Sequence, residues 1–478
     1  DNIQQRASFS IHWTKSTDSD SEAGSLKYKV VYSLLPDIDT VDKAESNGTV
    51  AQDWTEDIDS ADIFVPEGGK EYYFNVLVKD TAEDKNIYSM AVMHLYAYAW
   101  TKRIGGSNIE TQNYLTKDKN DNLYLCGFFG STINFAADWG GTDLKTVVGS
   151  YDGYIMRINA DGTYGWVKSF GGPGIDSASR IMLDKAGNIY VTGYFYNTVN
   201  FAADWGSTDS KTSAGGQDAF LMKINADGSY GWCKRIGGTG SEDIKSLAFD
   251  SYGNLYITGA FQNTVNFAED WGSMDSKTFA GVSDSYIMKI NSDGNYGWCK
   301  RIGGTKGDYS YELAIDTLGN LYSVGLFEDT VNFAEDWGIT DSKTSLGGWE
   351  MFLMKINANG TYGWCKRIGD TGNDRGTYIM IDSSNNLYIS GSFNNTVNFA
   401  ADWGAIDPKI SSGGTDAFIL KINAGGSYGW CKCLGGTGQD IFTNMAWDSS
   451  GNLYAVGSFQ GTVNFAADWN GNDSKTSD

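Results

Sequence analysis

Short runs rich in apolar residues, separated by polar turns, recur throughout residues 100–478. In one stretch these runs lie at 246–250, 255–261, 284–290 and 296–302, and the turns at 251–254 and 291–294 contain Gly, Asn and Asp. Runs of this length that are rich in Tyr, Ile and Phe predict β-strands. No segment keeps an apolar period of 3.6 residues, so we expect helices to be nearly absent.

The runs repeat with a fixed period of 66 residues, which two in-phase series of tryptophans mark. The first series is Trp100, Trp166, Trp232, Trp298, Trp364 and Trp430, and the second is Trp139, Trp205, Trp271, Trp337, Trp403 and Trp469. Six units without an insertion or deletion between them indicate a repeat architecture. Each unit contains four short strands, called A to D here, which is typical of a β-propeller blade. The sequence therefore predicts an all-β fold with six four-stranded blades.

The repeat also resembles a known family. The pattern Asp-x-x-Gly-Asn-x-Tyr-x-x-Gly lies at 250–259, Asp-Ala-Phe-x-x-Lys-Ile-Asn-x-x-Gly at 416–426, and Gly-Gly-Thr-Gly-x-Asp at 435–440. These motifs resemble the bacterial seven-bladed β-propeller repeat, although six units are visible here. The resemblance implies an extracellular bacterial protein and no defined activity.

Residues 1–95 lack the repeat and differ in pattern. Strand-like runs at 7–13, 26–33 and 69–78 resemble a fibronectin type III β-sandwich, with Trp13 as the core tryptophan and Tyr72 as the tyrosine corner. Only six residues precede the first run, so the usual first strand is short or missing. We therefore expect two domains, a sandwich at 1–95 and a propeller at 96–478.

The repeat is incomplete at both ends. Residues 98–104 match a strand D without the other three strands, whereas the last unit has strands A and B, followed by an insert that runs to Asp478. We expect the segment at 98–104 to complete the sixth blade, which lacks strand C. Either the chain continues beyond Asp478, or a strand from another subunit fills the gap by strand addition at an open sheet edge.

Charge and hydropathy narrow the range of partners. The net charge of −23 argues against nucleic acid, because phosphate binding needs clustered Lys and Arg. No apolar run approaches the ~20 residues that span a bilayer, so the chain is not expected to cross a membrane. No signal peptide is visible at Asp1, which leaves a cytosolic chain or one whose targeting segment has been removed.

Catalytic chemistry finds little support in the sequence. The two histidines, His12 and His94, lie in the first domain, so the repeats contain no Ser-His-Asp triad and no histidine metal centre. The irregular acids Glu242, Glu312 and Glu350 form no evident cluster. We therefore predict no enzyme and no cofactor. Calcium is the one candidate ion, because Asp and Asn are dense in the turns, and capping of those turns is the alternative role for these side chains.

The insert between strands B and C carries the candidate ligand-binding residues. Each copy reads Thr-Val-Asn-Phe-Ala-x-Asp-Trp-Gly and then Asp-x-Lys, and the insert shares one face of the propeller with the D–A loop. The tryptophans Trp139, Trp205, Trp271, Trp337, Trp403 and Trp469 would ring that face beside carboxylates, which suits a glycan or protein partner. In the structural alternative, Phe201 and Trp205 fix the insert onto the blade, and Asp209 pairs with Lys211.

The sequence thus predicts a secreted or cell-surface, non-catalytic binding or adhesion protein that uses its loop-rich propeller face. The alternative is a structural subunit of a surface layer, sheath or filament, in which copies of the chain assemble by strand complementation. A polysaccharide-active enzyme is the third and weakest hypothesis, since six copies of each polar group leave no singular site.

Overall fold

The computed structural model describes residues 7–15, 26–65, 71–80, 82–88, 91–94, 100–448 and 450–477. The chain forms two compact units, residues 1–103 and residues 104–478. Each unit is described by itself below.

The N-terminal unit contains two antiparallel sheets. One sheet pairs β1 (Ala7–His12) with β4 (Ser60–Val65), and the other has the order β3-β2-β5-β6, with β7 also paired to β5. The remaining strands are β2 (Lys27–Ser33), β3 (Thr49–Glu56), β5 (Glu71–Lys79), β6 (Lys85–Ile87) and β7 (Ala91–His94). Alternate residues of β2 and β5, including Tyr28, Val30, Tyr72 and Phe74, are buried and form its core.

One short α-helix, α1 (Val41–Asn47), was not predicted and is the only one in the described part of the chain. Its N-cap is Thr40, whose hydroxyl accepts a hydrogen bond from the backbone N–H of Lys43 at 3.3 Å. Such a cap satisfies one of the donors that have no partner in the first turn of a helix. Because the helix has only seven residues, it shows no sustained apolar period.

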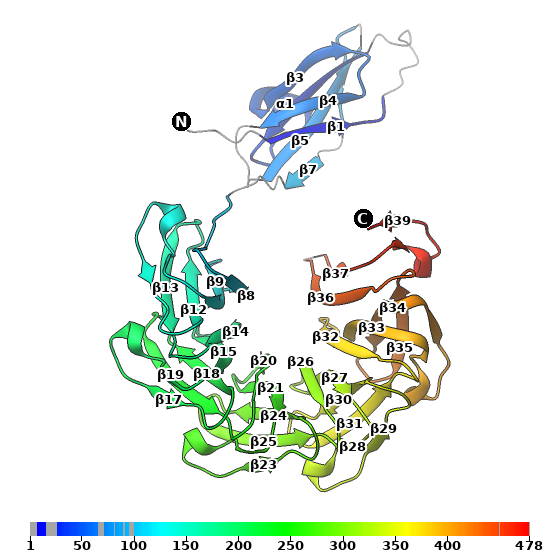
Figure 1. The fold of residues 1–478 in the computed structure, drawn as a ribbon. Coiled ribbons are helices and arrows are strands. Elements are labelled where there is room, and N and C mark those ends of the chain that lie inside the picture. Colours follow the sequence, from blue (N-terminus) through cyan, green and yellow to red (C-terminus); the bar gives the residue numbers. More distant parts are fainter. Residues whose placement is uncertain are drawn as a thin grey trace. The chain divides into compact units, whose positions relative to one another are not determined.

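The C-terminal unit contains five four-stranded antiparallel sheets and a sixth sheet of two strands (Figure 1). The strands follow chain order A, B, C, D within each sheet. Strands A and B are β8 (Glu110–Lys117) and β9 (Leu123–Phe129), β14 (Ser177–Leu183) and β15 (Ile189–Phe195), β20 (Ser246–Phe249) and β21 (Leu255–Phe261), β26 (Tyr309–Ile315) and β27 (Leu321–Phe327), β32 (Arg375–Ile381) and β33 (Leu387–Asn398), and β36 (Ile441–Trp447) and β37 (Leu453–Ser458). Strands C and D are β12 (Asp152–Ile158) and β13 (Tyr164–Phe170), β18 (Asp218–Ile224) and β19 (Tyr230–Ile236), β24 (Asp284–Ile290) and β25 (Tyr296–Ile302), β30 (Glu350–Ile356) and β31 (Tyr362–Ile368), and β34 (Pro408–Ile422) and β35 (Tyr428–Leu434).

Figure 1 shows these sheets following one another along an arc, with the A strands on its inner side. The prediction of an all-β fold built from repeated four-stranded antiparallel sheets is confirmed.

Each B–C insert folds into a small hairpin with a 3₁₀ turn at its tip. The hairpin strands are β10 (Ile133–Asn134) and β11 (Leu144–Lys145), β16 (Thr198–Asn200) and β17 (Ser210–Thr212), β22 (Thr264–Asn266) and β23 (Ser276–Thr278), β28 (Thr330–Asn332) and β29 (Ser342–Thr344), and β38 (Thr462–Asn464) and β39 (Ser474–Thr476). In the fifth unit the hairpin continues β33 and β34. The 3₁₀ turns are η1 (Ala137–Trp139), η2 (Ala203–Trp205), η3 (Glu269–Trp271), η4 (Glu335–Trp337), η5 (Ala401–Trp403) and η6 (Ala467–Trp469).

Aromatic side chains hold neighbouring sheets together. Phe201 of the second insert is fully buried, and its ring centroid lies 5.2 Å from Phe170 of the first sheet and 4.8 Å from Phe220 of the second. Tilted and edge-to-face pairs at these distances are favourable beyond the area they bury. The insert therefore belongs to the core between two units, which supports the structural role considered for Phe201.

The expectation that residues 98–104 form a strand D on the sixth blade is wrong where the structure can test it. Residues 98 and 99 lie outside the described residues, and residues 100–104 form no strand. The sixth sheet consists of β36 and β37. A strand D pairs with strand C in the complete sheets, and the sixth sheet offers no strand C as a template.

Candidate functional site

The predicted tryptophans lie in the inserts and bridge neighbouring units. The indole N–H of Trp205 donates to the carbonyl oxygen of Gly228 at 2.9 Å, in the C–D turn of its own unit. The Trp205 ring lies 5.3 Å from the Tyr230 ring, and the Lys168 ammonium of the preceding unit lies 5.2 Å from its centroid. The same indole bond occurs at Trp139, Trp271, Trp337 and Trp403, with lengths of 2.7–2.9 Å. The equivalent Trp469 is 52% exposed.

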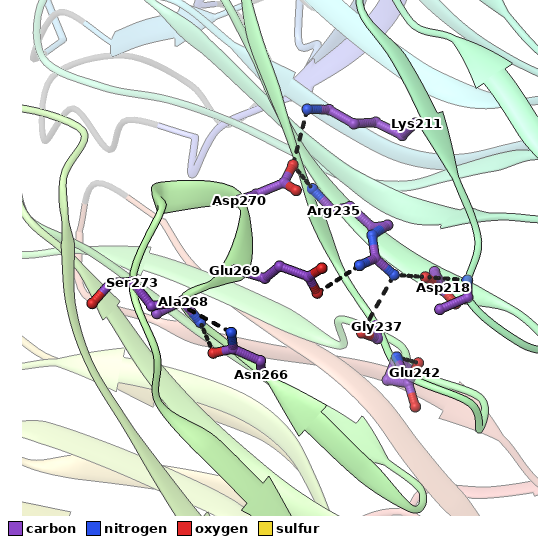
Figure 2. A network of polar contacts seen from close by, with 12 residues as sticks. Lys211, Asp218, Arg235, Gly237, Glu242, Asn266, Ala268, Glu269, Asp270 and Ser273 are labelled. Carbon is purple, nitrogen blue, oxygen red and sulfur yellow. Dashed lines mark hydrogen bonds and ion pairs between the residues drawn. The ribbon is translucent and has the colours of Figure 1, made fainter.

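The charged residues of the inserts also join units. Figure 2 shows Asp270 of the third insert between Lys211 and Arg235 of the second unit. Asp270 Oδ2 accepts the backbone N–H of Arg235 at 2.8 Å and lies 2.9 Å from Lys211 Nζ. Lys211 is also 3.3 Å from Asp209, which is the pair that the sequence indicated. The polar positions that every insert repeats thus have structural partners within the chain.

One position of strand A has five different residue types in the six units. At the repeat position of Arg180, which is the fourth residue of β14, the six units have Tyr114, Arg180, Ser246, Glu312, Tyr378 and Asn444. By contrast, the sixth residue of strand C is Lys in four of the five units that have this strand. A position whose residue varies this much among repeated units serves a role that the repeat itself does not require. The positions two and three residues earlier vary likewise, with six residue types each. We call the six residues at the position of Arg180 the inner column.

The inner column brings together residues that are far apart in the sequence. Arg180 Nη2 lies 3.2 Å from Glu312 Oε2, although a whole sheet lies between their two sheets in chain order. Arg180 Nε donates to the Lys245 carbonyl oxygen at 2.8 Å, and its guanidinium carbon is 4.7 Å from the Tyr114 ring centroid. The Ser246 hydroxyl donates to Glu312 Oε1. Contacts across so many units require that the A strands face one another on the inner side of the arc.

Burial shapes the electrostatics of the column. Glu312 is 9% exposed, and burial raises the pKa of its carboxyl, against the opposing effect of the Arg180 charge and the Ser246 hydroxyl. Burial, together with the Glu312 and Tyr114 charges, raises the pKa of Tyr378 to about 12. Tyr114, Arg180 and Glu312 all act electrostatically on Tyr378, so four of the six units contribute a side chain to one cluster. Such an arrangement offers a cation, a carboxylate and two phenols to a ligand.

An aromatic group from the fourth unit lies next to the column in sequence. The rings of Tyr309 and Tyr311 are nearly parallel, with an interplanar angle of 7° and centroids 6.4 Å apart, and Trp349 lies 5.7 Å from Tyr309. Arg375 of the fifth unit and Asp243 of the third both act electrostatically on the Tyr311 hydroxyl. All five residues occupy positions whose identity differs from unit to unit. We call Tyr309, Tyr311 and Trp349 the aromatic mouth.

Sequence reasoning singled out Glu312 but missed its partner. The structure brings Glu312 to Arg180, whereas Glu242 and Glu350 lie in other parts of the blades and accept hydrogen bonds from the backbone N–H groups of Gly238 and Leu346. Reading each repeat position down all six units would have revealed the inner column. Its contacts, however, depend on how the strands are arranged in space.

The other features considered as binding sites are a cleft between turns and the carboxylates of the turns. A cleft of about 280 Å³ lies between the A–B turns of the first two units, lined in part by Lys117, Lys119, Asp184 and Lys185. Asp184 Oδ1 accepts the N–H of Ala186 at 2.9 Å, so it caps its turn. In the described part of the chain, no group of three or more His, Cys, Asp or Glu residues is arranged to hold a metal ion. The described helices are all too short or too polar to cross a membrane.

Comparison with known proteins agrees with the fold. A profile of the β-propeller repeat family matches residues 165–194 and 231–260, which run from strand D of one unit into strand B of the next. The chain thus contains segments that are similar to β-propeller repeats. This repeat protein is 23% identical over 440 residues to a WD repeat-containing protein of Acanthamoeba polyphaga mimivirus, covering 77% of the chain and 31% of the relative.

A second relative is a regulatory protein, FlaEY, of Caulobacter vibrioides, with 23% identity over 359 residues that cover 70% of the propeller chain and 35% of FlaEY. The chain spans about a third of the length of both relatives. Among solved structures, a Synechocystis apocarotenoid oxygenase mutant aligns with 88% of this chain and 91% of its own, at a TM-score of 0.30 and 8% identity. At that TM-score the alignment carries no argument about function.

Proposed function

We propose that this propeller is a non-catalytic binding protein of the bacterial cell surface, and that its ligand contacts the inner column and the aromatic mouth. The observation that carries the proposal is the ion pair between Arg180 and Glu312, which joins two units at a strand A position that varies among the six. The insert tryptophans, in contrast, repeat in every unit, and five of the six use their indole N–H within the chain.

The chemistry of the site favours a glycan or an extended peptide. Ligand sites combine aromatic surfaces with a few polar groups that fix orientation. Tyr309, Tyr311 and Trp349 supply stacking surfaces, and Arg180 and Glu312 supply hydrogen-bond donors and acceptors. The net charge of −23 disfavours an anionic polymer as the partner.

The N-terminal unit fits the role of a spacer in this proposal. Its β3-β2-β5-β6 sheet and its β1-β4 sheet match the strand order of a fibronectin type III sandwich from the second strand of that fold onwards. Trp13 lies 5.8 Å from Tyr28 in the core, and Tyr72 is 1% exposed. We assign this unit to the fibronectin type III-like class as part of the proposal.

A glycan array of bacterial and host polysaccharide fragments, probed with the purified chain, tests the function. We expect a defined set of glycans to bind the wild type and to lose binding in Tyr311→Ala and Trp349→Ala. Trp271→Phe is the matched control, because it changes an aromatic residue of an insert. Absence of binding to any glycan or to a peptide library, or loss of binding in Trp271→Phe alone, would contradict the proposal.

A second function, assembly into a surface structure, is favoured by an apolar face on β37. Tyr454 and Val456 are 60% and 62% exposed, whereas Tyr388 and Ser390 at the same repeat positions are 8% and 0% exposed. An added strand or unit from a second copy would cover this face. Sedimentation velocity should then show concentration-dependent polymers that Val456→Lys abolishes. A monomer at every concentration would exclude assembly of this chain.

A further inference from the structure

Each complete blade contains a pair of buried carboxylic acids, one at the start of strand C and one in the following D–A loop. In the first unit these are Asp152 and Asp176, which are 3% and 0% exposed. Both carboxylates lie against the same Gly171–Gly172 dipeptide. A Cβ on Gly171 would lie 2.2 Å from Asp152 Oδ1, and the N–H of Gly172 donates to Asp176 Oδ2 at 2.7 Å.

Three of the five pairs have an arginine beside them. Figure 2 shows the second unit, in which Arg235 lies between Asp218 and Glu269, with Glu242 beside them. Arg235 Nη1 is 2.7 Å from Asp218, and Nη2 is 2.7 Å from Glu269 of the next insert. The third unit repeats this with Arg301, Asp284 and Glu335, and the fourth pairs Arg367 with Glu350.

The first and fifth units lack this arginine. Ser169 and Cys433 occupy its position, and Ala203 and Ala467 replace the glutamate of the following insert. Both residues are missing here, which leaves two short side chains where a guanidinium lies in the second unit. The fourth unit differs, because it keeps Arg367 although Ala401 replaces the glutamate. None of the ion pairs in the described part of the chain involves the acids of these two units, Asp152, Asp176, Asp416 and Asp440.

The acids of these two units also have unsatisfied oxygens. Oδ1 of Asp152 and Oδ1 of Asp416 are buried and have no hydrogen-bond partner. The equivalent Oδ1 atoms of Asp218 and Asp284 have none either, but the Oδ2 atoms of those two residues lie beside Arg235 and Arg301. Asp416 is 2% exposed, and a Cβ on Gly435 would lie 2.5 Å from its Oδ1, next to the Gly436 N–H that donates to Asp440. A buried carboxylate oxygen without a donor is costly unless a cation or a proton satisfies it.

We propose that the first and fifth units each bind one hard metal cation, of which Ca²⁺ is the fitting example, between Asp152 and Asp176 and between Asp416 and Asp440. The cation takes the electrostatic place that Arg235 and Arg301 hold in the second and third units. Carboxylate oxygens are the ligands that Ca²⁺ prefers, and water completes its coordination shell. This inference is independent of the ligand proposed for the inner column.

Calorimetric titration of the chelator-treated chain with CaCl₂ tests the proposal. We expect two Ca²⁺ ions per chain, with affinities in the range of extracellular calcium modules, and a rise in the unfolding temperature on binding. Asp152→Asn should reduce the stoichiometry to one ion, and Asp152→Asn combined with Asp416→Asn should abolish binding. Asp293→Asn, which changes an exposed turn carboxylate, should leave two sites.

A second variant keeps the test valid if the Asn substitutions unfold the chain. Ser169→Arg combined with Ala203→Glu copies the arrangement of the second unit into the first. It should fold, bind one ion fewer and gain stability without Ca²⁺. The proposal is overturned if the wild type binds no Ca²⁺, if the copied pair leaves both sites intact, or if lowering the pH stabilises the chain while Ca²⁺ has no effect, since protons would then satisfy the acids.

Discussion

Arg180 and Glu312 lie 132 residues apart in the sequence and form an ion pair with Nη2 and Oε2 at 3.2 Å. Neither residue belongs to the repeat consensus, since the other units have Tyr, Ser or Asn at their position. The pair therefore links the second and fourth units through a contact that the repeat itself does not supply. Both side chains are largely buried, since 28% of the side-chain surface of Arg180 and 11% of that of Glu312 is exposed.

Removal of one partner of this pair should destabilise the chain. Glu312→Gln leaves the Arg180 charge in a largely desolvated place, so we expect the free energy of unfolding to fall by about 1–3 kcal/mol. Urea unfolding of Glu312→Gln, Arg180→Gln and the double variant measures their coupling. The double variant should lose less than the sum of the single variants. Additivity within about 0.5 kcal/mol would show that the two side chains do not interact.

The D–A loop acids should make stability depend on pH. Burial and the nearby Asp284 raise the pKa of Asp308 to about 7 from its usual 3.8, despite Arg301 and the N–H of Gly304. A carboxyl whose pKa is raised on folding contributes stability below its unfolded pKa and loses it as the pH rises through its folded pKa. Asp308→Asn should therefore gain about 2–4 kcal/mol relative to the wild type between pH 4 and pH 8.

Urea unfolding at several pH values measures this difference. Asp293→Asn is the control, because hydrogen bonds from Asn295 lower the pKa of the exposed Asp293 and it does not titrate above pH 5. A constant difference between Asp308→Asn and the wild type at all pH values would contradict the assignment.

The insert tryptophans should differ in their contribution to stability. Trp205→Phe loses the indole bond to the Gly228 carbonyl at 2.9 Å, and we expect a loss of about 1–2 kcal/mol. Trp469 occupies the same repeat position but is 52% exposed, so Trp469→Phe should cost less than about 0.5 kcal/mol. Thermal unfolding of both variants compares one substitution in two surroundings. Equal losses would show that the indole bond does not stabilise the insert.

Close approach of strand C to the D–A loop should make Gly237 intolerant of a side chain. A Cβ there would lie 2.2 Å from the Asp218 carboxylate, so Gly237→Ala should cost about 2–4 kcal/mol by displacing this group from Arg235. Gly425→Ala is the control, because nothing lies within 4 Å of the added Cβ. Denaturant midpoints that shift alike in the two variants would contradict this packing.

The repeated pattern allowed the strands to be predicted, but it did not indicate which residues form the inner column. The bounds of β21, β24 and β25 are those that the short apolar runs indicated, because the apolar residues of these strands are buried in cores between sheets. The hairpin of each insert was not predicted, since its side chains bond to neighbouring units, as Asp270 does. The strand expected at 98–104 failed for a related reason, because its partner strand is not supplied by the sixth sheet.

The inner column could not be derived from one unit. Glu312 is an irregular acid in the sequence, but its meeting with Arg180 depends on the spatial order of the A strands. The signal available in the sequence was the variation of the residue at this position among the six units. The insert tryptophans gave the opposite signal, because a residue that every unit keeps is one that every unit needs for packing.

The central claim is that the inner column and the aromatic mouth bind the ligand. The most direct test measures the affinity of a glycan or peptide identified on the array for the wild type, Trp349→Ala and Trp271→Phe. We predict that Trp349→Ala weakens binding roughly tenfold or more, as loss of an aromatic anchor does, while Trp271→Phe binds as the wild type does. Undiminished binding by Trp349→Ala together with loss in Trp271→Phe would contradict the claim and place the ligand on the inserts.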